Sequence, residues 1–171
     1  MFYEAFMLPA RICILLCIAA VSYVYAEKHP RAGFLIYKGA WFDVEYPRDF
    51  TVKPSIASST PGKFDSAFFE SPDKDVRFYV FSPQWSGEAL DIAMNPVSEV
   101  EKDVKKESKD GTTRRWFTYA ARNGSRARSF LEITTAETKL VFGFEYADQA
   151  SYKKYLDSYL HFKKSIAQYA D

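Results

Sequence analysis

The side chains that could carry out nucleophilic or metal chemistry are few and scattered along the chain. The two histidines, His29 and His161, lie far apart, and both cysteines, Cys13 and Cys17, fall in one apolar segment near the start. A Ser/His/Asp system or a zinc site needs several such residues at defined spacing. We therefore predict no catalytic residue, no thiolate-metal site and no cofactor. We expect His161 to face solvent or cap a helix.

Carboxylates offer the remaining chemistry. Asp65, Asp73 and Asp75 surround one predicted hairpin and could provide oxygen ligands for calcium. Their spacing lacks the alternation and the glycine of an EF-hand loop, so we favour a solvated acidic turn. A hydrolase that uses Asp43, Asp65 or Asp75 is an alternative, because paired carboxylates can catalyse hydrolysis without histidine.

A loop around residues 82–88 is the first candidate for binding. Gln84 and Trp85 stand there among proline, serine and glycine, which keep the chain out of regular structure. The indole of Trp85 either folds back onto the core, which we favour, or stands at the surface as a recognition anchor.

A strand face is the second candidate for binding. Tyr119, Arg128, Phe130 and Glu145 are expected to surround Gly143, which has no side chain and would leave a shallow gap opposite Phe130. Ordinary cross-strand pairing is the favoured interpretation of these residues.

Two dipeptides organise the elements that position this second face. Asp110-Gly111 and Asn123-Gly124 are typical of two-residue type I′ turns, in which both central residues have positive φ. We also expect a two-residue turn at Ala136-Glu137. Cross-strand partners can then be assigned by counting outward from this turn and from the Asn123-Gly124 turn. The predicted pairs are Tyr119–Arg128, Phe117–Phe130, Trp116–Leu131, Arg115–Glu132, Ile133–Leu140, Leu131–Phe142, Ser129–Phe144 and Arg128–Glu145.

This register sorts the side chains onto two faces. One face is charged, and its arginines and glutamates are expected to form the opposite-charge pairs Arg115–Glu132 and Arg128–Glu145. The other face is apolar and collects Trp116, Leu131, Ile133, Leu140, Phe142, Phe144 and Tyr146.

A C-terminal helix is predicted to cover the apolar face. It begins after Asp148, a plausible N-cap, and carries an apolar stripe at three-and-four spacing. The stripe comprises Tyr152, Tyr155, Leu156, Tyr159, Phe162, Ile166 and Tyr169. Residues 97–108 fit either a helix or a strand, and the Asp-Gly turn after them favours a strand. Earlier strands are predicted at residues 34–37, 41–46 and 50–52, followed by a hairpin of 64–70 with 76–82.

The N-terminus has the pattern of an export signal. An uncharged apolar run at residues 12–24 follows Arg11 and ends in Val24-Tyr25-Ala26, which suits cleavage after Ala26. We therefore predict a signal peptide at residues 1–26 and a single domain, with a short flexible leader, at residues 27–171. The run is too short to span a bilayer, so no transmembrane segment is expected after processing.

Two alternatives concern this segment. Cys17 allows a lipoprotein, although Leu16 before it is unsuitable, and translation starting at Met7 would give a more typical signal than Met1. The predicted location is periplasmic or secreted.

The overall charge excludes one class of partner. The chain has 23 basic and 22 acidic residues, so it has no global field to attract nucleic acid. Its 18% aromatic content supplies core mass first and binding platforms second.

The order of elements resembles a known group. A strand region Phe42-Asp-Val-Glu-Tyr-Pro-Arg-Asp-Phe-Thr-Val52, a meander, and a helix containing Tyr159-Leu-His-Phe-Lys-Lys-Ser165 are similar to the PsbP/Mog1/DcrB-like domains. The resemblance implies an α+β sandwich, with an antiparallel meander covered by a C-terminal helix. It also implies an accessory or binding role without catalysis, and transfers no site residue.

The predicted function is therefore an exported, non-catalytic accessory or binding module that acts through contact with an unknown protein. The alternatives are a small-ligand or glycan binder that uses exposed aromatics, and the carboxylate-dependent hydrolase.

Overall fold

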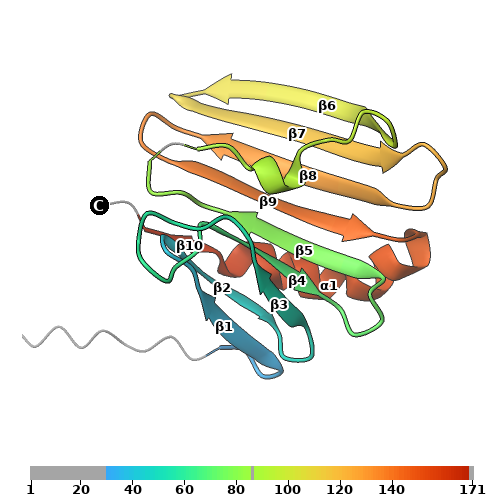
Figure 1. The fold of residues 1–171 in the computed structure, drawn as a ribbon, viewed down its shortest axis with the longest axis horizontal. Helices are drawn as coiled ribbons and strands as arrows, with labels where there is room; N and C mark the ends of the chain where they lie inside the picture. Colours follow the sequence, from blue (N-terminus) through green and yellow to red (C-terminus); the bar gives the residue numbers. More distant parts are fainter. Residues whose placement is uncertain (1–29, 86, 170–171) are drawn as a thin grey trace, which may run out of the picture.

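The structure, a computed structural model, describes residues 30–85 and 87–169. The predicted signal peptide and His29 lie outside the described residues. The chain forms an α+β sandwich, as expected. A seven-stranded antiparallel sheet in the order β3-β4-β5-β9-β8-β7-β6 packs against one helix, α1, and a small sheet in the order β1-β2-β10 (Figure 1).

Short aromatic strands build the first half of the fold. β1 (Phe34–Lys38) and β2 (Phe42–Pro47) pair in the small sheet. β3 (Thr51–Pro54), β4 (Ser66–Glu70) and β5 (Val76–Phe81) form one edge of the large sheet, and β4 and β5 are the predicted hairpin.

The meander has the predicted register. β6 (Glu99–Lys109), β7 (Thr112–Ala121), β8 (Ala127–Thr134) and β9 (Lys139–Tyr146) are consecutive neighbours. Tyr119 lies opposite Arg128, which lies opposite Glu145, and the other predicted partners match as well. The segment that fitted helix or strand is the edge strand β6.

The two glycine turns differ from each other. Asp110 and Gly111 both have positive φ, 50° and 74°, as a type I′ turn requires. At the second turn only Gly124 has positive φ, and its N–H donates to the carbonyl of Ala121. The type I′ prediction is therefore wrong for Asn123-Gly124, where a wider loop preserves the same register.

The helix α1 (Gln149–Ser165) begins as predicted, because the Asp148 side chain accepts a hydrogen bond from the Ser151 N–H at 2.7 Å. It ends earlier than the apolar spacing suggests. Ile166 is the C-cap, and β10 (Ala167–Gln168) then pairs with β2. Backbone pairing with an available strand edge therefore replaces the last predicted helical turn.

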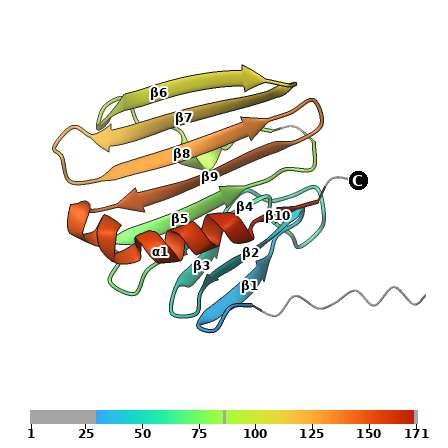
Figure 2. The ribbon, with the colours of Figure 1, turned by 180° about the vertical axis from the view of Figure 1, so that it is seen from behind.

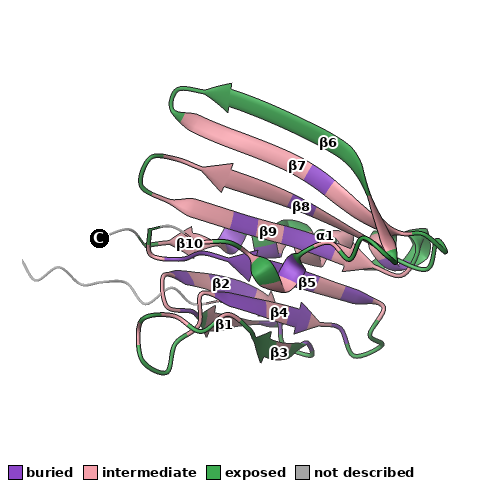
Figure 3. Ribbon diagram, turned by 45° about the horizontal axis from the view of Figure 1, so that its top comes forward, coloured by how far each residue is buried: buried purple, intermediate pink, exposed green. Residues whose placement is uncertain are grey.

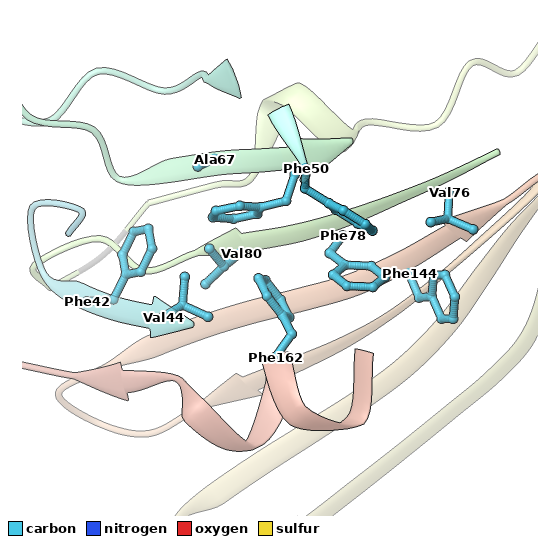
Figure 4. Close-up of a cluster of buried hydrophobic side chains, with 10 residues drawn as sticks. Phe42, Val44, Phe50, Ala67, Val76, Phe78, Val80, Phe144 and Phe162 are labelled. Carbon is cyan, nitrogen blue, oxygen red and sulfur yellow. The ribbon is translucent and has the colours of Figure 1, made fainter. Parts of the chain in front are cut away.

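The main core lies between the large sheet and the layer formed by α1 and the small sheet (Figure 4). Phe162 of α1 and Phe78 of β5 are fully buried, with ring centroids 5.2 Å apart. Phe42 and Val44 of β2 enter the same cluster. Aromatic side chains thus supply the apolar mass that this disulfide-free core requires.

The helix covers only part of the apolar sheet face. α1 packs on β2, β9 and β5, and Tyr152 and Tyr159 contact Phe144 at centroid distances of 5.3 and 4.7 Å. Figure 2 shows that β6, β7 and β8 extend beyond the helix on this side. The predicted covering of the whole face is wrong for four residues that belong to neither buried cluster: Trp116, Leu131, Ile133 and Phe142.

Candidate binding surface

A strap crosses the other face of the large sheet. It comprises residues 83–98 between β5 and β6, of which residue 86 is not described, and contains the 3-10 turn η1 (Leu90–Ile92) (Figure 1). Ile92 is 4% exposed and packs in a second buried cluster with Phe117, Phe130 and Val141. One aliphatic side chain therefore fastens the middle of the strap to the sheet.

Asp91 fixes the same point through hydrogen bonds. Its carboxylate accepts from the Tyr79 hydroxyl at 2.6 Å and from the Ser66 hydroxyl at 2.7 Å. Burial, together with the hydrogen bond to Asp91, raises the pKa of Tyr79. The phenol therefore remains a donor to Asp91 at neutral pH.

Arg128 fastens the C-terminal half of the strap. Its guanidinium donates to the carbonyls of Ile92 and Ala93 at 2.9 and 3.0 Å, and to the Glu99 carboxylate at 2.5 and 2.7 Å. The hydrogen bond from Arg128 lowers the pKa of Glu99, despite the opposing effect of burial. Glu88 adds an ion pair to Lys139 at 3.0 Å. The strap is thus held by both apolar and charged contacts.

The anchored strap presents apolar side chains to solvent. Trp85, Leu90 and Val97 are 68%, 74% and 84% exposed. They are three of the six large apolar side chains that are exposed among the described residues. Because exposed apolar side chains on an anchored loop are typical of recognition surfaces, the strap is the candidate binding element.

Two open grooves accompany the strap on this face. The first, of about 200 Å³, has a floor that includes Phe117, Tyr119 and Val141 and a wall formed by η1. The second, of about 180 Å³, is lined by three arginines and two glutamates, which include Arg77, Arg126 and Glu145. Arg77 and Arg126 share Glu145 at 2.6 and 2.9 Å, and Arg128 pairs with Glu99, so three positive charges meet two negative ones in the second groove.

Comparison with solved structures identifies the fold. The chain is similar to the solution structure of cyanobacterial PsbP (CyanoP) from Synechocystis sp. PCC 6803, with a TM-score of 0.51 and 12% sequence identity over 81% of this chain and 94% of that chain. The fold is PsbP-like. A crystal structure from Bacteroides thetaiotaomicron has a TM-score of 0.43 and 14% identity, over 81% of this chain and 49% of that chain. No family model and no curated protein sequence matches.

Trp85 of this PsbP-like domain does not fold inward as favoured from the sequence. Ile92, which comes later in the strap, is instead the side chain that packs in the buried cluster over the sheet. Gly87 brings the chain close to the Phe81 ring, which an added Cβ would approach to 3.3 Å. Gln84 is partly exposed beside Trp85, so both predicted loop residues lie at the surface.

The predicted charge pairs are wrong although their register is right. Arg128 binds Glu99 instead of Glu145, and Arg115 binds Glu101 at 2.6 Å instead of Glu132. β6 brings Glu99 and Glu101 onto this face, and β5 brings Arg77 to Glu145. Long side chains can reach past the residue directly opposite, and a third strand can supply the partner, so counting from the turns alone does not identify it.

The predicted gap over Gly143 is filled. A Cβ on Gly143 would lie 2.1 Å from an edge carbon of the Phe130 ring, and Phe130 itself is 6% exposed. Tyr119 lies near that ring, with centroids 6.2 Å apart. The four predicted face residues therefore lie close together. Phe130 fills the space over Gly143, while Tyr119, Arg128 and Glu145 also line the second groove.

The weak metal candidates do not converge. Asp65 precedes β4, whereas Asp73 and Asp75 follow it at the opposite end of the strand. Asp73 accepts hydrogen bonds from Lys154 at 2.8 Å and Tyr155 at 2.7 Å, so it ties the β4–β5 turn to α1. Within residues 30–85 and 87–169, no three potential ligands of the His, Cys, Asp or Glu type come together.

A partly buried contact between β2 and α1 shows that the expectation for His161, a side chain facing solvent or capping a helix, is wrong. His161 Nε2 lies 2.8 Å from Glu45 Oε2, and the imidazole packs on Phe34 with centroids 4.4 Å apart. Ser165, one helical turn later, accepts the Glu45 N–H at 2.8 Å and donates to the carbonyl of Phe162. The serine hydroxyl thus bonds to backbone atoms, and the contact joins β2 to the helix. The i, i+4 spacing of His161 and Ser165 was the available sequence signal.

Proposed function

We propose that this protein is an exported, non-catalytic accessory or binding module that acts through contact with another protein, and that the strap is its recognition surface. The supporting observation is the combination of three exposed apolar side chains with a backbone anchored by Asp91, Ile92 and Arg128. An anchored loop loses little conformational entropy on binding, so apolar burial contributes more fully to affinity.

The export part of the proposal rests on the apolar run before Ala26, which places the working protein in the periplasm or outside the cell. Within the described part of the chain, no helix has the length and apolarity needed to cross a membrane. The PsbP-like fold is compatible with an accessory role, although likeness of fold alone assigns no partner.

Trp85→Ala tests the recognition surface. The indole is mostly exposed, so the free energy of unfolding should fall by less than about 1 kcal/mol, whereas loss of a binding hot spot costs about 2 kcal/mol or more. The measurement is quantitative recovery of proteins from the exported fraction on immobilised protein, beside a urea midpoint. Val104→Ala, an exposed apolar change on β6, is the matched control.

The expected result is loss of a defined set of bound proteins with Trp85→Ala and retention of the set with Val104→Ala. Retention of the whole set by Trp85→Ala, with an unchanged midpoint, contradicts a recognition role for the strap.

A second candidate function, binding of a small ligand or glycan, is favoured by the exposed indole and by the groove of about 200 Å³ beside η1. Titration with oligosaccharides should then change the tryptophan fluorescence of the wild-type protein but not of Trp85→Ala. The hydrolase alternative gains no support, because Asp65 and Asp75 lie at opposite ends of β4 and Asp43 lies on β2 in the small sheet.

A further inference from the structure

The uncovered face of β6, β7 and β8 is a second surface, on the opposite side of the sheet from the strap. Trp116, Leu131 and Phe142 are direct neighbours in one row across β7, β8 and β9, and Ile133 lies beside the row. The row continues through Val80 into the core beneath α1, which shows that it lies on the helix side. All four side chains are partly exposed.

Basic side chains border this apolar row. The register places Lys102 opposite Thr118 and Lys105 opposite Trp116, so both lysines point to the helix side of β6. Lys109 and Arg114 lie on the same side by the same pairing. Glu107 is the one acidic residue of β6 on this side, and it pairs with Lys105 at 2.6 Å.

The remaining three cations are not neutralised by an ion pair, although Glu107 lies opposite Arg114 in the register. Within the described residues, Lys102, Lys109 and Arg114 form no ion pair. The whole chain is nearly neutral, with a formal charge of +1, so this excess of positive charge is local. Figure 3 shows that β6 is exposed over most of its length, from Glu101 to Lys109. The face therefore combines an apolar strip with a basic border.

We infer that this face docks an acidic protein segment, one whose apolar side chains cover the Trp116–Leu131–Phe142 row while its carboxylates meet Lys102, Lys109 and Arg114. We choose an acidic segment as the partner because its charge is complementary to the basic border of this face. A second copy of the chain would bring like charges together. A bilayer is also disfavoured, because the apolar side chains are half-buried and Lys105 Nζ lies 5.3 Å from the centre of the Trp116 ring, so no apolar group projects for insertion.

The test measures binding of two fluorescent probe peptides to the purified protein. One peptide of about twelve residues, enough to follow a strand of this length, alternates Glu or Asp with Leu and Phe. The other has Lys in place of each acidic residue. Lys102→Glu is the test variant, and Lys106→Glu is its matched control. Lys106 is exposed on the same strand and has the same charge, but its place opposite Arg115 puts it on the strap side.

The acidic peptide should bind saturably, and Lys102→Glu should weaken it by on the order of fivefold, since one attractive contact becomes repulsive. Lys106→Glu should leave binding within about twofold of wild type. Its charge lies on the other face of the sheet, so its interaction with the bound peptide is screened by salt and solvent. Leu131→Ser should also weaken binding, because it removes an apolar contact from the row. Its circular dichroism spectrum should stay unchanged, which shows that the variant is folded.

Three results overturn the inference: equal loss with Lys102→Glu and Lys106→Glu, equal binding of the acidic and basic peptides, or no binding of the acidic peptide. Binding to phosphatidylglycerol vesicles that is lost in Lys102→Glu, without peptide binding, also overturns it in favour of a membrane surface. Trp85 takes no part in this experiment, so its outcome is independent of the function proposed for the strap.

Discussion

The ion-pair network on the strap side leads to a quantitative prediction about Arg128. Its side chain is 14% exposed and binds the Glu99 carboxylate and two strap carbonyls. The Glu145 side chain is 13% exposed and forms ion pairs with Arg77 and Arg126. Arg128 and Glu145 lie directly opposite each other in the register, so proximity alone would make them partners. The observed contacts instead place them in separate clusters.

The magnitude follows from what each replacement leaves behind. Arg128→Met leaves two carbonyls without their donor and leaves the partly buried Glu99 carboxylate with only the Asn95 N–H, which should cost about 2 to 4 kcal/mol of unfolding free energy. Glu99→Gln removes the charge from the same contact, so the double change should cost about 1 to 2 kcal/mol less than the sum of the single changes. Arg128→Met with Glu145→Gln should be additive within about 0.5 kcal/mol, because the two neighbours share no hydrogen-bond or ion-pair partner.

The assay is urea unfolding of the wild type, of these single and double variants, and of Arg128→Glu, Glu145→Arg and their combination, with the slopes compared so that a change in compactness is detected. An exchange of the two residues, Arg128→Glu with Glu145→Arg, should be at least as damaging as the two single changes together. The exchange places a second carboxylate beside Glu99 and a third guanidinium beside Arg77 and Arg126. Substantial recovery of stability by that exchange would refute the assigned contacts.

Three further predictions concern local geometry and processing. Gly143→Ala should lower the free energy of unfolding by about 1 to 3 kcal/mol in a urea titration, because the new Cβ meets the Phe130 ring and a backbone carbonyl. Burial alone would raise the pKa of Asp73, but the hydrogen bonds from Lys154, Ser71 and Tyr155 together outweigh it and lower the pKa. Its stabilisation is therefore present above about pH 4 and lost as pH falls, so Asp73→Asn should flatten that decline in acid unfolding. Mass spectrometry of protein from the envelope or medium should show Glu27 as the first residue, and recovery of an intact N-terminus would contradict processing.

Local signals in the sequence determined most of the meander. The Asn-Gly turn and the turn at Ala136-Glu137, with the requirement that apolar residues share a face, predicted the pairing of β7, β8 and β9 without any tertiary information. Asp148 marked the start of α1 because its carboxylate can satisfy an N–H of the first turn. The end of α1 was not predictable in this way, since Ile166 leaves the helix to allow β10 to pair with β2.

Side-chain partners on the strap side depended on elements that local patterns did not place. The sequence shows that Arg128 has a glutamate opposite it, but Glu99 became its partner only because β6 pairs with β7 in a bulged register. The burial of Ile92 and the exposure of Trp85 likewise depend on how the strap crosses the sheet. From the residue types alone, the larger side chain, Trp85, was expected to be buried. The position of η1 places the smaller side chain, Ile92, over the sheet instead.

The two faces of the large sheet thus obtain their coverings in different ways. On the helix side, α1 buries Phe144 and leaves the rows nearer β6 uncovered, so apolar area remains available beyond the helix. On the strap side, a segment with little regular structure is held by Asp91 and Arg128, whose hydrogen bonds supply the rigidity that a helix would provide. An irregular strap held in this way can leave Trp85 and Leu90 exposed without losing its position. Because a binding loop must combine exposed apolar side chains with a fixed backbone, these polar anchors link the fold to the proposed recognition role.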